Sequence, residues 1–216
     1  LADSPAGLRL RQSKISRERV TAVEYGPDMA VSEHLARVLE LQNEYSASAT
    51  PAMRERNGLV TRTVPPLLLK TLQNKEGLSI PPSHLHVGGG GGAGRNSAVP
   101  WIIISDSRQT TAPSRGWYLV LLFCARGENV FLSLNKTSTV HVGGPDASWN
   151  PQPIGKAKAR RDREAARRLL ADQIANCPLP LVEKINLQSE LAIPKAYQET
   201  HVVGVEYPVD ALPSDD

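Results

Sequence analysis

Three short apolar runs in the middle of the chain constrain its fold more than any other feature. They span Trp101–Asp106, Trp117–Phe123 and Val130–Asn135, and each is rich in β-branched, aromatic or leucine residues. Turn-forming stretches separate them, at Ser107–Gly116 and at Arg126–Asn129. Short apolar runs bounded by turn residues are typical of buried strands. The sequence therefore predicts a central meander of strands that supplies much of the core.

Helical patterns flank this meander on both sides. Val31–Tyr45 is expected to be a helix, and so are Val64–Asn74 and Ala157–Asn176, because apolar residues recur in them at helical spacing. Residues 46–63 are polar and are expected to form a loop, whereas His201–Tyr207 is expected to be a late strand. This order predicts an α+β fold with a curved, barrel-like, mostly antiparallel sheet flanked by helices.

Several details follow from the same patterns. In the first helix, Gln42 shares the helical spacing of the apolar residues Leu35, Val38 and Leu39. In the long basic helix, the residues expected to face inward are Ala165, Ala166, Leu169, Leu170 and Ile174. Further extended pieces are expected at Arg17–Tyr25, at Ile185–Leu187 and where Ala196-Tyr197 leads into the late strand.

The 216 residues suit one large domain. We assign residues 1–28 to an N-terminal segment of uncertain role, residues 29–213 to the domain and residues 214–216 to a tail. No apolar run approaches the roughly 20 residues that span a bilayer, and the N-terminus lacks a signal-peptide pattern. Cys124 and Cys177 are expected to be reduced structural thiols. Together these features predict a cytoplasmic protein.

Positive charge is concentrated in one segment of a nearly neutral chain. The net charge is +3, yet the segment from Lys156 to Arg168 holds seven Lys or Arg residues and two acidic ones. Such a segment indicates local contact with a polyanion, for example a clamp on a DNA backbone. The alternative is an ordinary solvated helix face.

The glycine run from Gly88 to Gly94 invites comparison with a phosphate-binding loop. A P-loop requires Gly-Lys-Ser/Thr at the start of a helix, but here Arg95-Asn96-Ser97 follows and the next element is a strand. A nucleotide site is therefore not expected. The run is either a flexible connection between strands or a loop whose N–H groups approach a DNA phosphate together with Arg95.

Aromatic and acidic residues at the strand ends offer a second kind of site. Trp101, Trp117 and Tyr118 are either core residues or stacking surfaces for a base. Because neighbouring residues of a strand face opposite sides, at most one of Trp117 and Tyr118 lines a given pocket. Asp106 either caps a turn or accepts hydrogen bonds from the edge of an extruded base.

No catalytic set is evident. The five histidines are scattered, and the sequence contains no nuclease motif, nucleophile elbow or zinc-ligand spacing. We therefore expect a domain that is not an enzyme and that carries no cofactor or metal. Two alternatives stay open: a stand-alone nuclease or hydrolase with an unrecognised site, and a protein-interaction module whose basic helix meets an acidic partner.

The central motifs resemble those of the McrB-like N-terminal domain. This domain precedes GTPase or nuclease modules in type IV, modification-dependent restriction systems. The resemblance extends from about Val31 to Pro213, and Ser97 and Lys136-Thr137 depart from the family pattern. The motifs are Gly92-x-Gly94-Arg95-Asn96-x-Ala98-Val99-Pro100-Trp101 with three isoleucines, Asp106-x-Arg108-x-Thr110-Thr111, Gly116–Phe123, Val130–Asn135 and Gly204–Tyr207.

The resemblance implies recognition of modified double-stranded DNA, with 5-methylcytosine as the first candidate and base flipping as the candidate mechanism. It also implies a nuclease or GTPase module as partner and no nuclease activity in the domain itself. We expect the basic helix and two loops, Gly88–Asn96 and Asp106–Arg115, to hold the DNA backbone. A pocket formed by strand ends, with Trp101, Asp106 and Trp117 or Tyr118, is expected to accept the modified base. The candidate DNA-binding residues are Arg95, Asn96, Trp101, Asp106, Arg108, Thr110, Arg115, Trp117, Tyr118, Lys156, Lys158, Arg160 and Arg161.

Overall fold

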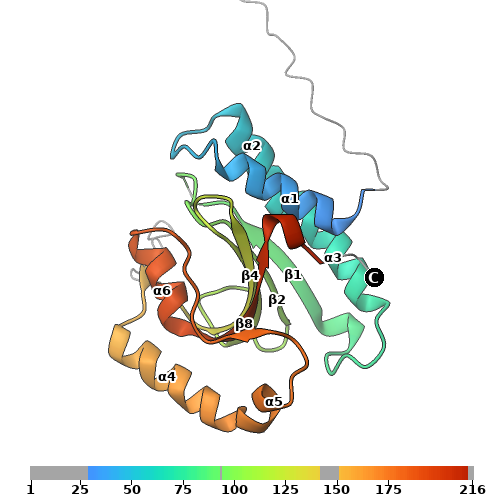
Figure 1. Cartoon of the computed structure of the whole chain (residues 1–216), viewed down its shortest axis with the longest axis vertical. Helices are drawn as coiled ribbons and strands as arrows, with labels where there is room; N and C mark the ends of the chain where they lie inside the picture. Colours follow the sequence, from blue (N-terminus) through green and yellow to red (C-terminus); the bar gives the residue numbers. More distant parts are fainter. Residues whose placement is uncertain (1–28, 93, 142–150, 214–216) are drawn as a thin grey trace, which may run out of the picture.

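An antiparallel sheet of six strands, in the order β1-β2-β3-β4-β8-β7, forms the centre of the structure (Figure 1). The computed structural model describes residues 29–92, 94–141 and 151–213. The strands of the sheet are β1 (Leu85–Gly90), β2 (Trp101–Asp106), β3 (Trp117–Phe123), β4 (Asn129–Lys136), β7 (Leu181–Val182) and β8 (His201–Pro208). Two short strands, β5 (Thr139–His141) and β6 (Pro151–Pro153), pair separately. The predicted strand at Arg17–Tyr25 lies outside the described residues.

The predicted meander is confirmed, and the predicted barrel is wrong. β2, β3 and β4 pair in sequence order, with Ile103 opposite Val120 and Val120 opposite Ser133. The sheet stays open, because β1 and the two-residue β7 form its edges and do not pair with each other. A barrel buries apolar side chains inside itself, whereas this sheet buries them on both faces against helices. The fold class is α+β, with an open sheet that does not close into a barrel.

Three helices cover one face of the sheet (Figure 1). They are α1 (Val31–Gln42), α2 (Pro51–Gly58) and α3 (Val64–Gln73). Val38 and Leu39 of α1 pack in one cluster with Ile102 of β2 and Phe123 of β3, and all four side chains are buried. The two helices predicted on this side, Val31–Tyr45 and Val64–Asn74, are confirmed.

The loop predicted at residues 46–63 is wrong over most of its length. α2 begins at Pro51, capped by the Thr50 hydroxyl, which accepts a hydrogen bond from the Met53 N–H at 3.2 Å. It continues through a π-helical turn, Leu59–Thr63, directly into α3. Proline lacks an N–H, so Pro65-Pro66 withholds two donors and accounts for the widened turn before it. The polar sequence concealed the helix because its buried face includes a charged residue, described below.

The other face is covered by α4 (Lys156–Leu169) and α6 (Ala192–Thr200), which lie side by side (Figure 1). The helix predicted at Ala157–Asn176 is in fact two, because it breaks at Leu170 before the short α5 (Ala171–Ala175). Its predicted stripe is confirmed only in part: Ala166 is buried and Ile174 packs against the same cluster, but Ala165 is exposed and Leu169 is 81% exposed.

Near the end of the chain the prediction is mixed. β8 confirms the strand predicted at His201–Tyr207. Ala196-Tyr197 lies inside α6 rather than in an extended lead-in. Ile185 and Leu187 are buried but belong to no strand, whereas Leu181–Val182 forms β7. Within the described ranges, no helix is both long and apolar enough to cross a membrane.

The glycine run matters to the fold because β1 lies against the helical segment that joins α2 to α3. A Cβ atom placed on Gly89 would lie 1.7 Å from the Val60 carbonyl oxygen, which is backbone and cannot rotate away. At Gly155, by contrast, a Cβ atom would meet nothing within 4 Å.

We therefore expect Gly89→Ala to lower the free energy of unfolding by ~1–3 kcal/mol, because β1 and the helix must move apart. The matched control is Gly155→Ala, at the residue that precedes the first turn of α4. This substitution should lower the free energy of unfolding by at most about 1 kcal/mol. Urea denaturation of both variants measures the difference. Equal stabilities would contradict the close approach of the two backbones.

Candidate functional site

A cavity of about 770 Å³ opens between the end of β1, the start of β2 and the start of α6. Trp101 forms part of one wall, and Leu191, Ile193 and Tyr197 form another. Among the described residues that line it, none is Asp, Glu, Lys or Arg. The volume falls within the usual range of ligand-binding cavities, and apolar walls with few polar groups suit an uncharged, flat ligand.

The glycine run makes room for the Trp101 indole. Gly90 pairs with Trp101 across the two strands, and a Cβ atom on Gly90 would lie 2.4 Å from the indole ring. The indole can therefore lie over the neighbouring backbone, half-buried, at the cavity wall. Gly88–Gly90 thus belong to a strand, and only the later glycines connect β1 to β2.

The glycines after β1 form a tight turn. The Ser97 N–H donates to the Gly91 carbonyl oxygen at 2.7 Å. Gly92 has φ +120°, and a Cβ atom there would lie 2.1 Å from the Arg95 carbonyl oxygen. Only glycine fits this conformation and spacing. Arg95 itself is exposed at the outside of the turn.

Asn96, one of the candidate DNA-binding residues, holds a neighbouring loop in place. Its amide nitrogen donates to the carbonyl oxygens of Ser46 and Ser48, at 2.9 and 2.7 Å. Its amide oxygen accepts a hydrogen bond from Asn57 at 2.9 Å. Asn96 also lines the cavity. Its polar atoms are thus engaged in fixing the shape of the rim.

A buried polar network lies beneath this turn, and sequence reasoning missed it. Arg56 donates hydrogen bonds to the side-chain oxygens of Gln42 and Asn57 and to the Gly91 carbonyl oxygen. Gln42 in turn donates to the Ala98 carbonyl oxygen at 2.8 Å. Burial lowers the pKa of Arg56 to about 10, so the guanidinium is still charged at neutral pH. The one available signal was Gln42, a polar residue at an apolar helical position.

Tyr118 and Trp117 lie on opposite faces of β3, as the alternation predicts. Tyr118 is buried beneath the cavity, where its hydroxyl donates to the Pro113 carbonyl oxygen at 3.2 Å and contacts the Ser138 hydroxyl. Burial raises the pKa of Tyr118. Trp117 is covered by Lys136, whose ammonium lies 5.1 Å from the ring centre. Neither residue lines the cavity.

Asp106 lies at the far end of β2 from Trp101, so the two cannot share a pocket. It caps the following turn, accepting the Arg108 N–H at 2.9 Å, and its carboxylate pairs with the Arg108 guanidinium at 2.6 Å. Hydrogen bonds from Arg108 lower the pKa of Asp106 to about 2. Thr110 is buried in the same turn, and Arg115 is exposed. The predicted single pocket of Trp101, Asp106 and Trp117 or Tyr118 is therefore not formed.

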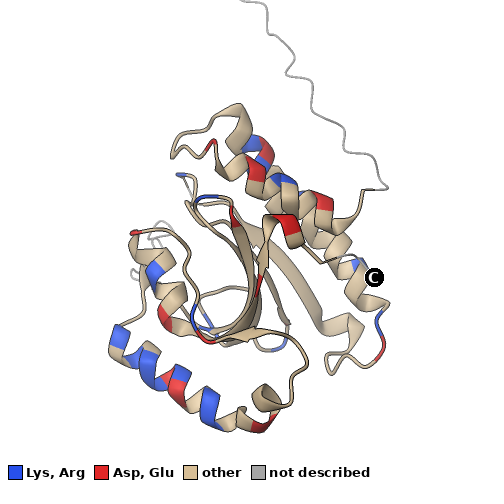
Figure 2. Cartoon of the chain, in the orientation of Figure 1, with Lys and Arg blue, Asp and Glu red and all other residues tan. Residues whose placement is uncertain are grey.

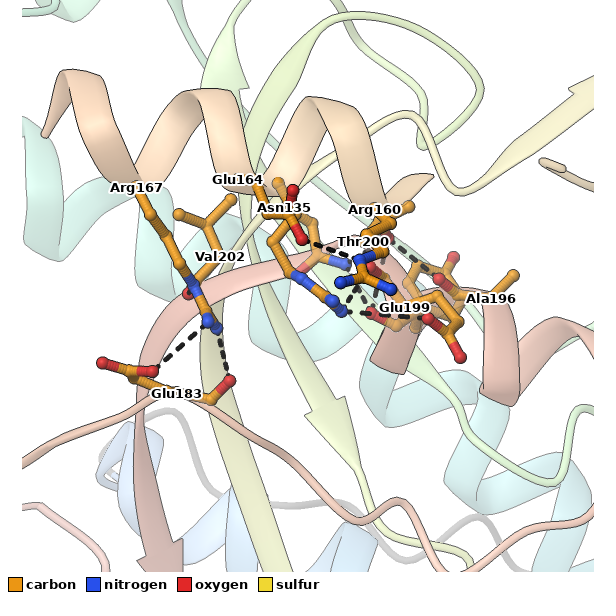
Figure 3. A network of polar contacts seen from close by, with 11 residues as sticks. Asn135, Arg160, Glu164, Arg167, Glu183, Ala196, Glu199, Thr200 and Val202 are labelled. Carbon is orange, nitrogen blue, oxygen red and sulfur yellow. Dashed lines mark hydrogen bonds and ion pairs between the residues drawn. The ribbon is translucent and has the colours of Figure 1, made fainter. Parts of the chain in front are cut away.

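Lys and Arg residues are concentrated along α4 (Figure 2), and the arginines among them divide by direction (Figure 3). Arg163 and Arg167 turn inward, donating to the carbonyl oxygens of Glu199 and Val202 at 3.0 and 2.7 Å. Figure 3 also shows Arg167 reaching Glu183. These contacts hold α4 on α6 and β8, which explains why a helix with so few apolar residues packs there at all.

The remaining cations of α4 face solvent. Lys158 and Arg160 form pairs one helical turn apart with Asp162 and Glu164, at 2.6 and 2.7 Å. Exposed pairs of this kind contribute little to stability. In the part of the chain that the structure describes, the other three exposed cations have no ion pair; they are Lys156, Arg161 and Arg168.

A second buried network fixes the end of α6. Asn135 donates to the Thr200 hydroxyl at 3.0 Å and to the Tyr197 carbonyl oxygen at 3.1 Å. A hydrogen bond of 2.6 Å joins Ser133 to His201. This serine–histidine contact is not a hydrolase site, because both side chains are 0% exposed and no substrate reaches them. Across the described residues, no group of three or more potential metal ligands is assembled either.

His201 makes stability depend on pH. Burial lowers the pKa of His201 from its ordinary 6.5 to about 4. At pH values between these two pKa values, His201 is protonated in the unfolded chain and neutral in the folded chain. Stability is therefore complete above about pH 6.5 and falls as the pH drops toward 4, by roughly 3 kcal/mol in total.

We expect His201→Gln to remove this part of the pH dependence, and His84→Gln, at a half-buried histidine outside the network, to retain it. Urea denaturation of wild type and both variants between pH 4 and 8 measures it. Identical slopes for wild type and His201→Gln would refute the assignment.

Comparison with known proteins places the chain in a family. Neither a search of curated proteins nor one of solved structures finds a match. The model of the MrcB-like N-terminal domain family matches residues 40–216, which include the glycine turn, the cavity and α4. This confirms the resemblance carried by the central motifs. The chain belongs to the MrcB-like N-terminal domain family, whose domains serve generally as DNA-binding specificity modules of type IV restriction systems and not as catalytic units.

Proposed function

We propose that this domain binds double-stranded DNA carrying a modified base, with 5-methylcytosine as the first candidate, and accepts that base in the cavity after it has been flipped out. The observation that carries the proposal is the cavity of about 770 Å³, whose described lining residues include Trp101 and no charged side chain. Extruding a base costs a few kcal/mol, and stacking it on an aromatic ring returns ~1–3 kcal/mol.

The lining of the cavity favours a methyl group over a charged modification. Its described residues include Leu191, Ile193 and Trp101 but no charged side chain. A charged modification buried there would lack a partner, whereas a methyl group would gain apolar contact. Such contact discriminates by only ~1–3 kcal/mol. The domain should therefore also bind unmodified DNA, more weakly.

α4 is suited to hold the DNA backbone beside the cavity. It packs against α6, whose first residues form a cavity wall, so the outward cations and the cavity are joined by one helix. Lys156, Arg161 and Arg168 are exposed on α4, and Arg95 is exposed at the rim. Together they would contact phosphates on either side of an extruded base. In this role the domain directs a nuclease or GTPase module to modified sites.

The direct test compares binding of one duplex in unmodified, cytosine-methylated, hydroxymethylated, adenine-methylated and phosphorothioate forms. We expect the methylcytosine duplex to bind most tightly, by roughly 5- to 150-fold over the unmodified one. Equal affinities for all five forms would reject the proposal. Metal-dependent cleavage of the duplex by this chain alone would favour the nuclease alternative instead.

Trp101→Ala should weaken binding of the methylated duplex about tenfold, because the stacking surface is lost. Trp117→Ala is the matched control, since Trp117 is covered by Lys136 and lies outside the cavity lining. Fluorescence anisotropy with labelled duplexes measures both. A larger loss in the control than in Trp101→Ala would place the base elsewhere.

Replacing Lys156, Arg161 and Arg168 together by glutamine should reduce the slope of log affinity against log salt by about 2–3, equally for modified and unmodified duplexes. The three residues are exposed, so the fold should be retained, and circular dichroism checks this. A wild-type slope near zero would exclude a phosphate clamp and favour a protein partner for α4.

A further inference from the structure

Arg56 is the largest side chain that the described part of the molecule buries completely, at 0% exposed, yet it has no acidic partner there. Its hydrogen bonds end on the neutral oxygens of Gln42, Asn57 and Gly91. Burying a charge is costly unless it is paired, and an apolar residue would fill the same space without that cost. A buried, unneutralised guanidinium therefore calls for a reason other than packing.

The contacts of Arg56 lead toward the rim of the cavity, and Gln42 also donates to the Cys124 carbonyl oxygen at 3.0 Å, which does not line it. Gly91 lies between two residues that line it, Gly90 and Gly92. Gln42 donates to the Ala98 carbonyl oxygen at 2.8 Å, and Ala98 also lines the cavity.

The remaining contacts reach Asn96. Asn57 donates to the Asn96 side-chain oxygen at 2.9 Å. The guanidinium lies 5.8 Å from the centre of the Tyr45 ring, and the Tyr45 hydroxyl donates to the Asn96 carbonyl oxygen at 3.2 Å. One side chain thus holds the glycine turn, the start of β2 and the segment after α1 in a fixed relation.

We propose that Arg56 is a positioning residue for the cavity: its planar guanidinium sets the rim formed by Gly91, Asn96 and Ala98, and thereby sets discrimination between modified and unmodified bases. The inference rests on the proposed function. Arginine suits this task because its five donors diverge in one plane and reach several acceptors at once, which a lysine ammonium on a flexible stem does not.

The first experiment compares Arg56→Met with the control Arg54→Met. Arg54 lies on the same helix but is exposed, and it donates to the Ala49 carbonyl oxygen at 3.1 Å rather than to the rim. We expect Arg56→Met to weaken binding of the methylated duplex about tenfold while changing the unmodified duplex less than about twofold. A general loss of stability would weaken both duplexes by one factor. An unchanged ratio of affinities would overturn the proposal.

Arg56→Lys separates the geometry of the side chain from its charge. It retains the positive charge but reaches fewer acceptors, so we expect the ratio of affinities to fall as it does in Arg56→Met. Full rescue by lysine would show that the charge alone matters, and would overturn the positioning role. If Arg56→Met does not fold, Asn57→Ala takes its place, because it cuts the link to Asn96 and leaves the Gln42 and Gly91 contacts.

A measurement without DNA keeps this inference distinct from the proposed function. In Arg56→Met or Asn57→Ala, amide hydrogen exchange should rise in residues 46–49 and 91–98 and stay unchanged in β3 and β4. Undiminished protection of the rim would overturn the positioning role whatever the domain binds. A different result is a wild type that shows no preference for any modified duplex, while the variants still exchange faster at the rim. That result would reject the proposed function but would support Arg56 as the residue that positions the rim.

Discussion

The close approach of β1 to the helical segment Leu59–Thr63 is the constraint on which the cavity depends. It requires a glycine at position 89, where any side chain would collide with the Val60 carbonyl. It also brings α2 beneath the turn after β1, so that Arg56 reaches the Gly91 carbonyl oxygen. A glycine on the same strand, Gly90, leaves room for the Trp101 indole. Gly89 thus permits the packing of β1 on the helix, and Gly90 permits the placement of Trp101 at the site. These structural roles explain why the run lacks the pattern of a phosphate-binding loop.

Much of the fold was accessible from sequence pattern, because apolar periodicity reports which faces are buried. β2, β3, β4, β8, α1 and α3 followed that rule. α2 did not, since its buried face carries Arg56, and periodicity counts a buried arginine as solvent-exposed. α4 failed in the opposite way: Leu169 matched the expected stripe but is exposed, whereas Arg163 and Arg167 turn inward. The barrel was wrong because a continuous apolar run shows that both faces of a strand are buried, but not whether helices or other strands cover them.

The site was predictable only in part, since a pocket depends on register and on contacts between distant segments. Trp101 was a sound candidate for the wall of a cavity. Asp106 was grouped with it because the two residues are near in sequence, yet the length of β2 separates them. The opposite wall comes from α6, about 90 residues later in the chain. No local spacing in the sequence predicts that α6 and Trp101 line the same cavity. The family motifs pointed to DNA recognition without showing which side chains face the cavity.

The second buried network and Arg163 fix one end of α6, so that this helix sets a distance within the domain. Its first turn borders the cavity, and its last turn is bound to Asn135 and to Arg163 of α4. Nine helical residues separate these ends by about 13 Å along the axis, at 1.5 Å per residue. In the proposed complex, this rigid helix would set the distance between the extruded base and the phosphates that contact α4. The proposed function therefore implies that a duplex is read in the register that this length permits.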